Sequence, residues 1–329
     1  MVPRKPMYTY IAKRLLMLLP TLFGAAILVF ALLRLIPGDV CDLKFGGEGG
    51  YVDPEQIAMC REMLGLGDPV YLQFFEYMKS FLTLDLGISM WTQAPVSEEI
   101  AARIEISVEI AILATLTSIF VALPLGILSA VRQNTMTDYV VRGISIAGIA
   151  MPSFWLGILI ILGLLIGTQA WFGTPWMPPV DFKSIFDDPA YNLSQLIWPA
   201  LATGYRYSAV ATRMTRSAML EVLREDYVRT ARAKGLIEKV IVNRHALKNA
   251  MLPVITIIGM EFAFLMGGLV VTEQVFNLNG VGKLLVESVL QSDFTMTQAL
   301  VMFCVVIFLV TNFVVDVLYA TLDPRIRYS

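Results

Sequence analysis

Four long stretches without a single charged residue limit what this chain can fold into. They cover residues 15–33, 110–131, 143–180 and 294–315, which are 19, 22, 38 and 22 residues long. A helix needs about 20 apolar residues to cross a bilayer, because it rises about 1.5 Å per residue. Each stretch can therefore span a membrane, and 57% apolar against 16% charged residues favours a membrane protein over a soluble one.

Two further apolar segments each carry one charged residue. Residues 193–212 contain Arg206, and residues 249–272 contain Glu261. We count both as spans, which brings the total to six. Strict alternation of apolar and polar residues is missing and the segments are too long for barrel strands, so a β-barrel is disfavoured. We predict an all-α integral membrane protein with six transmembrane helices.

The first apolar stretch follows four basic residues, as the core of a secretory signal peptide would. The stretch is longer than such a core, and no small-x-small cleavage site appears before Arg34. We therefore expect it to be a retained membrane anchor.

Charge asymmetry between the connecting segments predicts the orientation. Of the 25 Lys and Arg, 17 fall on one side with only six of the 27 acids, in residues 1–14, 132–142, 213–248 and 321–329. The other side holds seven basic and 19 acidic residues. Because basic loops stay in the cytoplasm, both termini are expected there. This topology alone explains why the basic residues lie next to the membrane lipid. We therefore expect no nucleic-acid partner.

Residues 37–101 form the largest predicted segment outside the membrane. Glycines at 46–50 indicate a loop, and Pro54 then starts the amphipathic stretch "PEQIAMCREMLGL". A second amphipathic piece, "YLQFFEYMKSFL", follows. We expect a small extracytoplasmic helical subdomain.

Two of the three cysteines, Cys41 and Cys60, lie in this outer segment, where the compartment permits oxidation. They either form a disulfide or pack as two small apolar side chains, and the sequence leaves both readings open. A count of free thiols would separate them. Cys304 lies within the last span, where ordinary packing is expected.

Residues able to perform catalysis are scarce. The single histidine, His245, cannot assemble a metal cluster or a histidine-based triad. "GGEGG" at 46–50 lacks the Lys-Ser/Thr of a phosphate-binding loop and reads as a linker. We therefore predict that the chain is not an enzyme and binds no metal or cofactor itself.

Charged residues inside predicted spans are costly and normally face a partner or a water-filled path. Arg206, Glu261 and Asp316 qualify, and we hypothesise that all three line a translocation path. Arg206 and Glu261 are expected to pair, either along that path or purely to let two helices insert. Asp316 is near the end of its span and could simply reach the interface.

A basic amphipathic segment, "LREDYVRTARAKGLIEKVIVNRHALKNAMLP", covers residues 223–253. Ala231 and Gly235 are four apart, so on a helix they share a face with almost no side chain. Leu236 and Ile237 form an apolar tip, and a basic collar surrounds it, made of Arg229, Arg232, Lys234 and Lys239. We predict a short helix that projects from the membrane and docks in a groove of a soluble partner.

This segment resembles the cytoplasmic loop of permease subunits in ATP-binding-cassette (ABC) importers of the dipeptide/oligopeptide/nickel group. That loop reads Glu-Ala-Ala, three residues, Gly, and later Leu-Pro. Thr230, Ala231 and Arg232 take the first places here, Gly235 the glycine, and 252–253 the end. Thr230 stands where the broad consensus has Glu, and in this the loop resembles that of the peptide subgroup. Further motifs match in order over essentially the whole chain: "RLIPGD" (34–39), "LDLGIS" (84–89), "MPSFWLG" (151–157) and "VVDVLYATLDPRIRYS" (314–329).

The resemblance implies a type I importer permease fold and the first of two non-identical permeases, the B-type subunit. The implied divisions are 1–36 (N-terminus and first helix), 37–101 (outer subdomain), 102–320 (five-helix core with coupling loop 213–248) and 321–329 (tail). It also implies which residues contact the ATPases: Thr230, Ala231, Arg232, Lys234, Gly235, Leu236, Ile237 and Glu238.

The same resemblance implies partners and a location. A second homologous permease, two cytoplasmic ATPases that bind ATP and Mg, and an extracytoplasmic solute-binding protein would complete the assembly in a bacterial or archaeal cytoplasmic membrane. Small peptides are the expected cargo, with nickel, oligosaccharides, opines or glutathione-like compounds as alternatives. A membrane receptor that binds a signalling partner through its basic loop is the competing function.

Overall fold

The computed structural model describes residues 7–35, 41–42, 54–63 and 65–322, and these fold into helices joined by turns and loops. The only extended pairing among them is one isolated bridge between Ile88 and Pro95. The elements in chain order are α1 (Met7–Leu35), α3 (Pro54–Met63), α4 (Val70–Thr83), α5 (Val96–Val131), α6 (Met136–Ala150), α7 (Ser153–Phe172), α8 (Pro189–Val222), α9 (Asp226–Ala233), α10 (Glu238–Val240), η1 (Ile241–Ala246), α11 (Leu247–Gly268), α12 (Val270–Val275), α13 (Val281–Leu290) and α14 (Phe294–Leu322).

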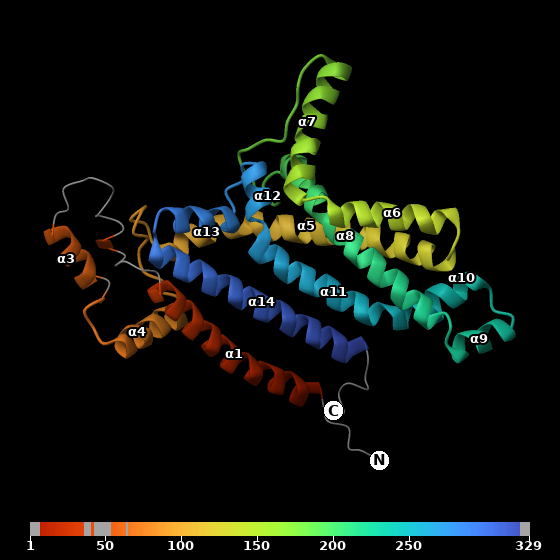
Figure 1. Ribbon diagram of the computed structural model, residues 1–329, viewed down its shortest axis with the longest axis horizontal. Coiled ribbons are helices and arrows are strands. Elements are labelled where there is room, and N and C mark those ends of the chain that lie inside the picture. Colours follow the sequence, from red (N-terminus) through yellow and green to blue (C-terminus); the bar gives the residue numbers. More distant parts are fainter. Residues whose placement is uncertain (1–6, 36–40, 43–53, 64, 323–329) are drawn as a thin grey trace.

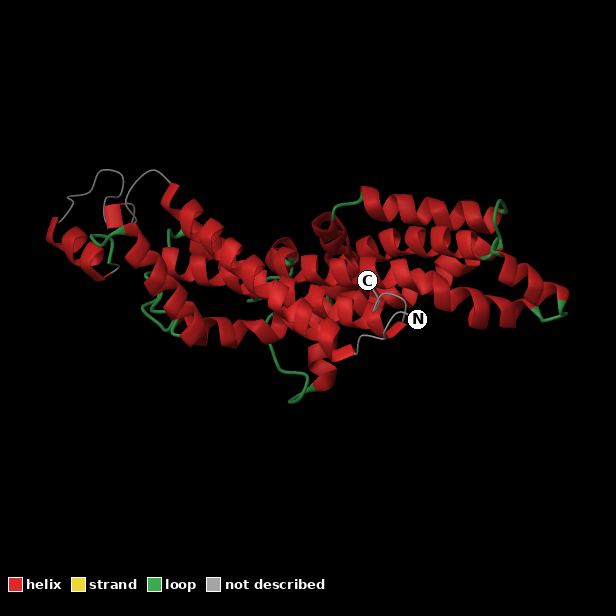
Figure 2. Ribbon diagram, turned by 90° about the horizontal axis from the view of Figure 1, so that it is seen from below, coloured by secondary structure: helices red, strands yellow, loops and turns green. Residues whose placement is uncertain are grey.

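The long helices α1, α5, α8, α11 and α14 run lengthwise through an elongated molecule (Figure 1). The short helices α9 and α10 lie at one end of its long axis, and α3 and α4 lie at the other, as the view turned by 90° also shows (Figure 2). Helix α1 begins and helix α14 ends on the α9 side. The segment predicted to dock a partner is therefore at the opposite end from the predicted outer subdomain.

Five described helices are long and apolar enough to cross a membrane, judged by length and composition. These are Tyr8–Leu32, Val96–Val131, Ser153–Phe172, Glu238–Gly267 and Phe294–Leu318. Each overlaps one of the six predicted spans. The remaining prediction, residues 193–212, lies within α8, a continuous helix that is less apolar because residues such as Gln195, Thr203 and Arg206 interrupt its apolar positions.

The apolar stretch 143–180 does not form one helix, which corrects the prediction of a single long span. Helix α6 ends at Ala150, and Met151 is extended with φ −86° and ψ 124° before Pro152. A residue before proline is pushed out of the helical region, and proline itself offers no N–H. Helix α7 therefore starts afresh at Ser153 and leaves the other helices at a steep angle (Figure 1).

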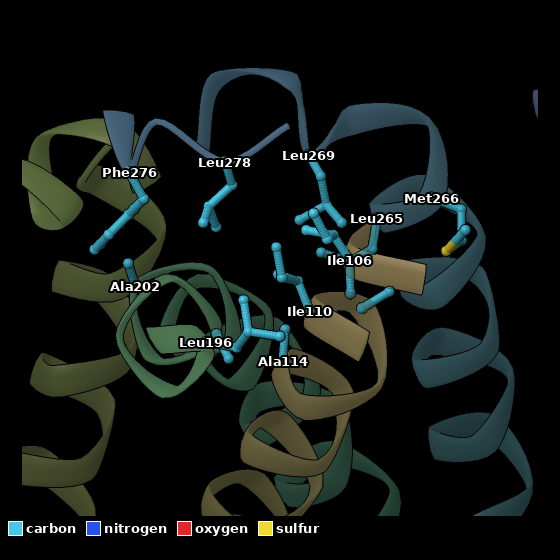
Figure 3. Close-up of a cluster of buried hydrophobic side chains, with 12 residues drawn as sticks. Ile106, Ile110, Ala114, Leu196, Ala202, Leu265, Met266, Leu269, Phe276 and Leu278 are labelled. Atoms are coloured by element: carbon cyan, nitrogen blue, oxygen red, sulfur yellow. The ribbon is translucent and has the colours of Figure 1, made fainter. Parts of the chain in front are cut away.

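The main apolar core joins α5 to α8, α11 and the segment after α12. Ile106 and Ile110 of α5 meet Leu196 of α8, Leu265 of α11 and Leu278, and these side chains converge in one cluster (Figure 3). Each is at most 3% exposed. The core fixes the positions of the helices that carry the candidate functional residues.

Small residues bring α8 unusually close to its neighbours. A Cβ added to Gly204 would lie 2.7 Å from the backbone oxygen of Ala114, and one added to Gly126 would lie 2.5 Å from Thr215 Cβ. On α6, a Cβ at Gly148 would lie 2.9 Å from Ala209 Cβ. Small residues at such crossings let helix backbones pack tightly. One side of α8 is thereby covered by α5 and α6.

A buried carboxylate holds the turn between α12 and α13. Glu273, which is 0% exposed, accepts a hydrogen bond from Ser107 Oγ at 2.7 Å and another from the Lys283 N–H at 2.7 Å. A Cβ on Gly280 would lie 2.2 Å from Glu273 Oε1, so only glycine fits beside the carboxylate. Burial raises the pKa of Glu273. The end of the bundle remote from α9 is therefore tied to α5 through Ser107.

Candidate coupling segment and membrane face

The segment after α8 folds as a short helix, a tight turn and a second helix. Helix α9 ends at Ala233, and Gly235 follows with φ +78°, a left-handed conformation that glycine adopts at little cost. A Cβ on Gly235 would meet nothing within 4 Å. The expectation that Gly235 shares a helical face with Ala231 is thus wrong, because the helix has already ended and the glycine serves the turn.

Ala231 faces the interior of the protein. It is 7% exposed and packs in a small apolar cluster with Val228, Ile241 and Leu223. Its short side chain therefore lets α9 lie close to η1 of the same chain. The predicted docking of a partner on the face of Ala231 does not fit this arrangement, since that face is already covered.

The outward side of the segment combines charge with an apolar tip. Thr230, Arg232 and Lys234 are exposed, and the Thr230 hydroxyl donates to the backbone oxygen of Asp226 at 2.9 Å. Leu236 is 41% and Ile237 66% exposed at the far end of the turn. An exposed apolar pair rimmed by basic side chains is a surface suited to a protein partner.

An ion pair closes the turn around Gly235. Arg232 donates from Nη2 to Glu238 Oε1 at 2.7 Å and from Nε to Oε2 at 3.2 Å. The hydrogen bonds from Arg232 lower the pKa of Glu238. Both side chains are about half exposed, so the pair adds little stability, but its two-point geometry fixes the shape of the turn.

Tyr227 attaches α9 to the start of α11. Its hydroxyl donates to the backbone oxygen of His245 at 3.4 Å and accepts from Asn249 Nδ2 at 2.7 Å. His245 lies in η1, a single stretch of π-helix, which is a rare form that often marks functional sites. These two hydrogen bonds connect α9 to the helix formed by α10, η1 and α11.

A buried ion pair that sequence reasoning missed joins α6 to α8. Arg216 donates from Nε and Nη2 to the two carboxylate oxygens of Asp138, each at 2.8 Å. Ser129 of α5 also donates to this carboxylate, and so does the Asn134 N–H at 3.0 Å. Arg216 holds the pKa of Asp138 far below its usual range. The last turns of α8, which lead into α9, are thus fixed to the α5–α6 hairpin.

The opposite face of α8 is uncovered and polar. Arg206, Val210, Arg213 and Ser217 are spaced by four, three and four residues, so they line up along one side of the helix. Arg206 and Arg213 are exposed, and a concavity of about 350 Å³ lies at Val210, Arg213, Met214 and Ser217. A polar stripe on a membrane-embedded helix needs a water-filled path or a partner chain in front of it.

Glu261 is buried in α11 without a partner. It is 8% exposed, and neither carboxylate oxygen accepts a hydrogen bond from the described residues. Within the same described part of the chain, no ion pair links Glu261 to Arg206, so the hypothesised pairing is not formed in this structure. A buried carboxylate that is ionised and unpaired is costly, which makes Glu261 a position where a partner or a solute could interact.

Asp316 pairs with the first helix. Its Oδ2 lies 3.1 Å from Arg14 Nη1, and the Tyr10 hydroxyl donates to its backbone oxygen at 3.5 Å. The pair joins the start of α1 to the end of α14. A role for Asp316 in the translocation path stays a prediction. In this structure Asp316 connects α14 to α1.

The sulfur atoms of Cys41 and Cys60 lie at bonding distance, with the two Cα atoms 5.8 Å apart. The two residues pack with Met90 in a small apolar cluster. The positions of the two residues fit a disulfide as well as the packing of two free cysteines. The disulfide stays a prediction, which a count of free thiols tests. Cys304 is a free thiol within α14.

Among the residues that the structure describes, no group of three His, Cys, Asp or Glu side chains could hold a metal ion. What the geometry offers is a bundle of long apolar helices, a polar face on one of them and a projecting helix–turn–helix. Together these define a membrane transport subunit of the permease class.

Comparison with known proteins identifies the family. Residues 122–328 match the family described as binding-protein-dependent transport system inner membrane component, and residues 7–111 match its N-terminal counterpart. The chain belongs to this family of permeases, which confirms the resemblance found in the sequence.

Two relatives and one solved structure illustrate the similarity. The glutathione transport system permease protein GsiC of Salmonella choleraesuis is 41% identical over 325 residues, covering 98% of this chain and 100% of the relative. GsiC of Escherichia coli K12 is 39% identical over 323 residues, with the same coverage. The inward-facing methionine ABC transporter MetNI shares 15% identity at a TM-score of 0.52, covering 70% of this chain and 98% of that one. The predicted type I ABC importer permease fold is confirmed, and the chain is a multi-pass inner-membrane permease subunit and not an enzyme.

Proposed function

We propose that this chain carries small peptides or glutathione-like solutes across the membrane as the B-type permease of an ABC importer. The observation that carries the proposal is the segment 226–240, a projecting helix–turn–helix with an apolar tip, Leu236 and Ile237, attached directly to α11. Such a segment suits mechanical attachment to a separate ATPase.

The proposed attachment site is the outward surface of this segment. Arg232, Lys234, Leu236, Ile237 and Glu238 contact a groove of the ATPase, together with Thr230. Ala231 and Gly235 act indirectly: the first lets α9 pack on η1, and the second makes the turn. This division of roles refines the sequence prediction, in which all eight residues touched the ATPase.

Movement of α9 reaches the membrane by two connections. Tyr227 links α9 to α11 through His245 and Asn249, and the end of α8 enters α9 after only a short turn. When the ATPases close, we expect α8 and α11 to shift together. These helices carry Arg206 and Glu261, so the shift changes the surroundings of both charges.

The proposed translocation path runs along the uncovered face of α8. Arg206 and Arg213 line it, and Glu261 becomes accessible to it in one of the transport states. Two cations and one anion that are not paired with each other suit a solute with both carboxylate and ammonium groups, as in peptides. The 39–41% identity to glutathione permeases supports this class of cargo.

The remaining parts of the assembly are proposed from the family. ATP and Mg bind to two ATPase subunits on the side of α9, and a second permease faces the polar side of α8 across the proposed path. A solute-binding protein docks at the end of the bundle remote from α9. The basic connecting segments support a cytoplasmic location for both termini.

Solute-dependent ATP hydrolysis by the reconstituted complex tests the proposal. Binding protein loaded with a dipeptide or with glutathione should stimulate hydrolysis, whereas nickel or an oligosaccharide should not. Stimulation by only the latter pair would change the cargo assignment. Failure of this permease to attach to the ATPases at all would contradict the proposed function itself.

A further inference from the structure

A polar pocket lies at the end of the bundle remote from α9, between α1, α4 and α14. Its volume is about 250 Å³, and its walls are about equally polar and apolar, with Arg34, Glu76, Tyr77 and Gln298 among the lining side chains. None of these residues belongs to the coupling segment or to the proposed path. The pocket therefore needs its own explanation.

Two polar atoms in this pocket are buried and unsatisfied. The Tyr77 hydroxyl and Gln298 Nε2 lie next to each other, and neither makes a well-formed hydrogen bond within the described residues. Buried polar groups in folded proteins are nearly always hydrogen-bonded, so a missing partner indicates a missing ligand or water. Both groups can donate, which favours a ligand that presents acceptor oxygens.

The charges in the pocket are one cation and one anion. The Arg34 guanidinium lies 3.7 Å from the centre of the Phe30 ring and donates to Gln73 Oε1, from Nε at 3.2 Å. Glu76, three residues after Gln73 on α4, is exposed and also lines the pocket. A ligand with separate negative and positive groups would satisfy both.

Helix α4 packs against the part of α1 that is apolar enough to cross a membrane. Phe74 makes edge contacts with Phe30 at 5.2 Å and with Phe23 at 5.8 Å between ring centroids. Phe23 lies nine residues before the end of the α1 span at Leu32, which is roughly 13 Å at 1.5 Å per residue. Large apolar side chains on α4 nevertheless remain uncovered, including Tyr71 at 64% and Phe75 at 66% exposed. Aromatic side chains exposed at this level are typical of the membrane interface.

We propose that this pocket binds the headgroup of one zwitterionic phospholipid from the adjacent leaflet, whose acyl chains cover the exposed apolar face of α4. The phosphate accepts hydrogen bonds from Arg34, Tyr77 and Gln298, and the ammonium group lies against Glu76. A phospholipid, unlike a soluble anion, explains the pocket and the uncovered aromatic residues together. It also accounts for the direct continuity of this face with the α1 span.

Native mass spectrometry of the detergent-purified transport complex tests this site. Phosphatidylethanolamine and phosphatidylglycerol with identical acyl chains are added separately, and the soluble headgroup glycerophosphoethanolamine forms a third arm. The wild-type complex should retain one phosphatidylethanolamine molecule, in preference to phosphatidylglycerol. Arg34→Gln should lower the retention of both lipids about tenfold, since hydrogen bonds to a charged group are lost.

Two further variants separate the roles of the pocket residues. Gln298→Leu keeps the side-chain volume and should also lower retention, whereas Glu76→Gln should abolish the preference for phosphatidylethanolamine and leave phosphatidylglycerol bound. Lys79→Gln removes a charge on the same helix outside the pocket and serves as the control.

Several outcomes would overturn the proposal. If Arg34→Gln retains as much phospholipid as Lys79→Gln, Arg34 does not bind the phosphate. If Glu76→Gln keeps the preference for phosphatidylethanolamine, Glu76 does not bind the ammonium group. Displacement of the lipid by an equal concentration of glycerophosphoethanolamine would make the pocket a site for a soluble ligand. A wild-type complex that retains no phospholipid would show that a protein partner covers the face.

Discussion

Arg216 of α8 donates two hydrogen bonds of 2.8 Å to Asp138 of α6, and the Asp138 side chain is completely buried. The two residues are 78 positions apart in the sequence. Arg216 lies in the last turns of α8, shortly before the turn that leads into α9, so this pair holds the end of α8 against α6. It stabilises the arrangement on which the proposed coupling depends.

Replacing Asp138 should destabilise the protein by about 2 kcal/mol or more, because Asp138→Asn leaves the largely buried Arg216 without its counter-charge. Thermal unfolding of the purified permease measures this. Asp226→Asn removes a 95% exposed partner of Arg229 and should change the free energy of unfolding by less than about 0.5 kcal/mol. Equal melting temperatures for the two variants would contradict the structural importance of the pair.

The same pair predicts a direction for pH dependence. Arg216 lowers the pKa of Asp138, so the contribution is fully present above the ordinary aspartate pKa of about 3.9. It is lost as pH falls from there toward the lower value in the folded protein. Wild type and Asp138→Asn should therefore differ in stability at pH 7, and this difference should shrink progressively as the pH falls below about 4. A difference that is unchanged by acid would count against this assignment.

Gly235 should tolerate asparagine better than alanine or valine. The space around its Cβ position is empty, so the cost comes from φ +78° and amounts to about 1 kcal/mol for alanine. Asparagine enters the left-handed region more readily, whereas a β-branched residue does so least. Solute-dependent ATP hydrolysis should fall in the order Gly, Asn, Ala, Val. Equal activity of Asn and Val would mean that the turn conformation does not matter.

Arg206 and Glu261 should act independently. Because no ion pair joins them, the effects of Arg206→Gln and Glu261→Gln on stability should add to within about 0.5 kcal/mol in the double variant. Glu261→Gln should leave stability unchanged or raised, since an unpaired buried carboxylate is replaced by a neutral group. Each single variant should lower uptake of peptides. Mutual rescue in the double variant would restore the pairing hypothesis.

Cys41 and Cys60 are expected to be bridged. Unreduced, denatured protein should then show one free thiol, that of Cys304, and three after reduction. Closing the loop between positions separated by 19 residues should stabilise the protein by about 3 kcal/mol. Three free thiols without reductant would reject the bridge and leave the packing interpretation.

Patterns local in the sequence predicted much of the fold. Four uncharged stretches and the stretch around Glu261 located five helices able to span a membrane, and Pro54 marked the first residue of α3. The basic segment around residues 226–240 was expected to be helical and does form α9 and α10. These features depend on composition and periodicity within one element, which is what a sequence shows directly.

Features that depend on contacts between distant elements were not predictable. Asp138 and Arg216 gave no signal, because each looks like an ordinary charge in a basic loop. Ala231 was assigned to an outward face, and only the packing of Ile241 shows that it faces inward. Pro152 inside an apolar stretch predicted a bend, but not that one helix ends at Ala150 and another starts at Ser153.

The proposed coupling depends most on Ile237, whose exposed apolar side chain binds the ATPases. Co-purification of the ATPase subunits with Ile237→Asp, together with solute-dependent ATP hydrolysis, tests it most directly, because a 66% exposed side chain can be changed without disturbing the fold. Phe186→Asp, which alters a 90% exposed side chain in the loop between α7 and α8, is the matched control. We expect Ile237→Asp to lose at least tenfold in attachment and in stimulated hydrolysis while Phe186→Asp keeps its ATPases. Full attachment and stimulation in Ile237→Asp would contradict the account.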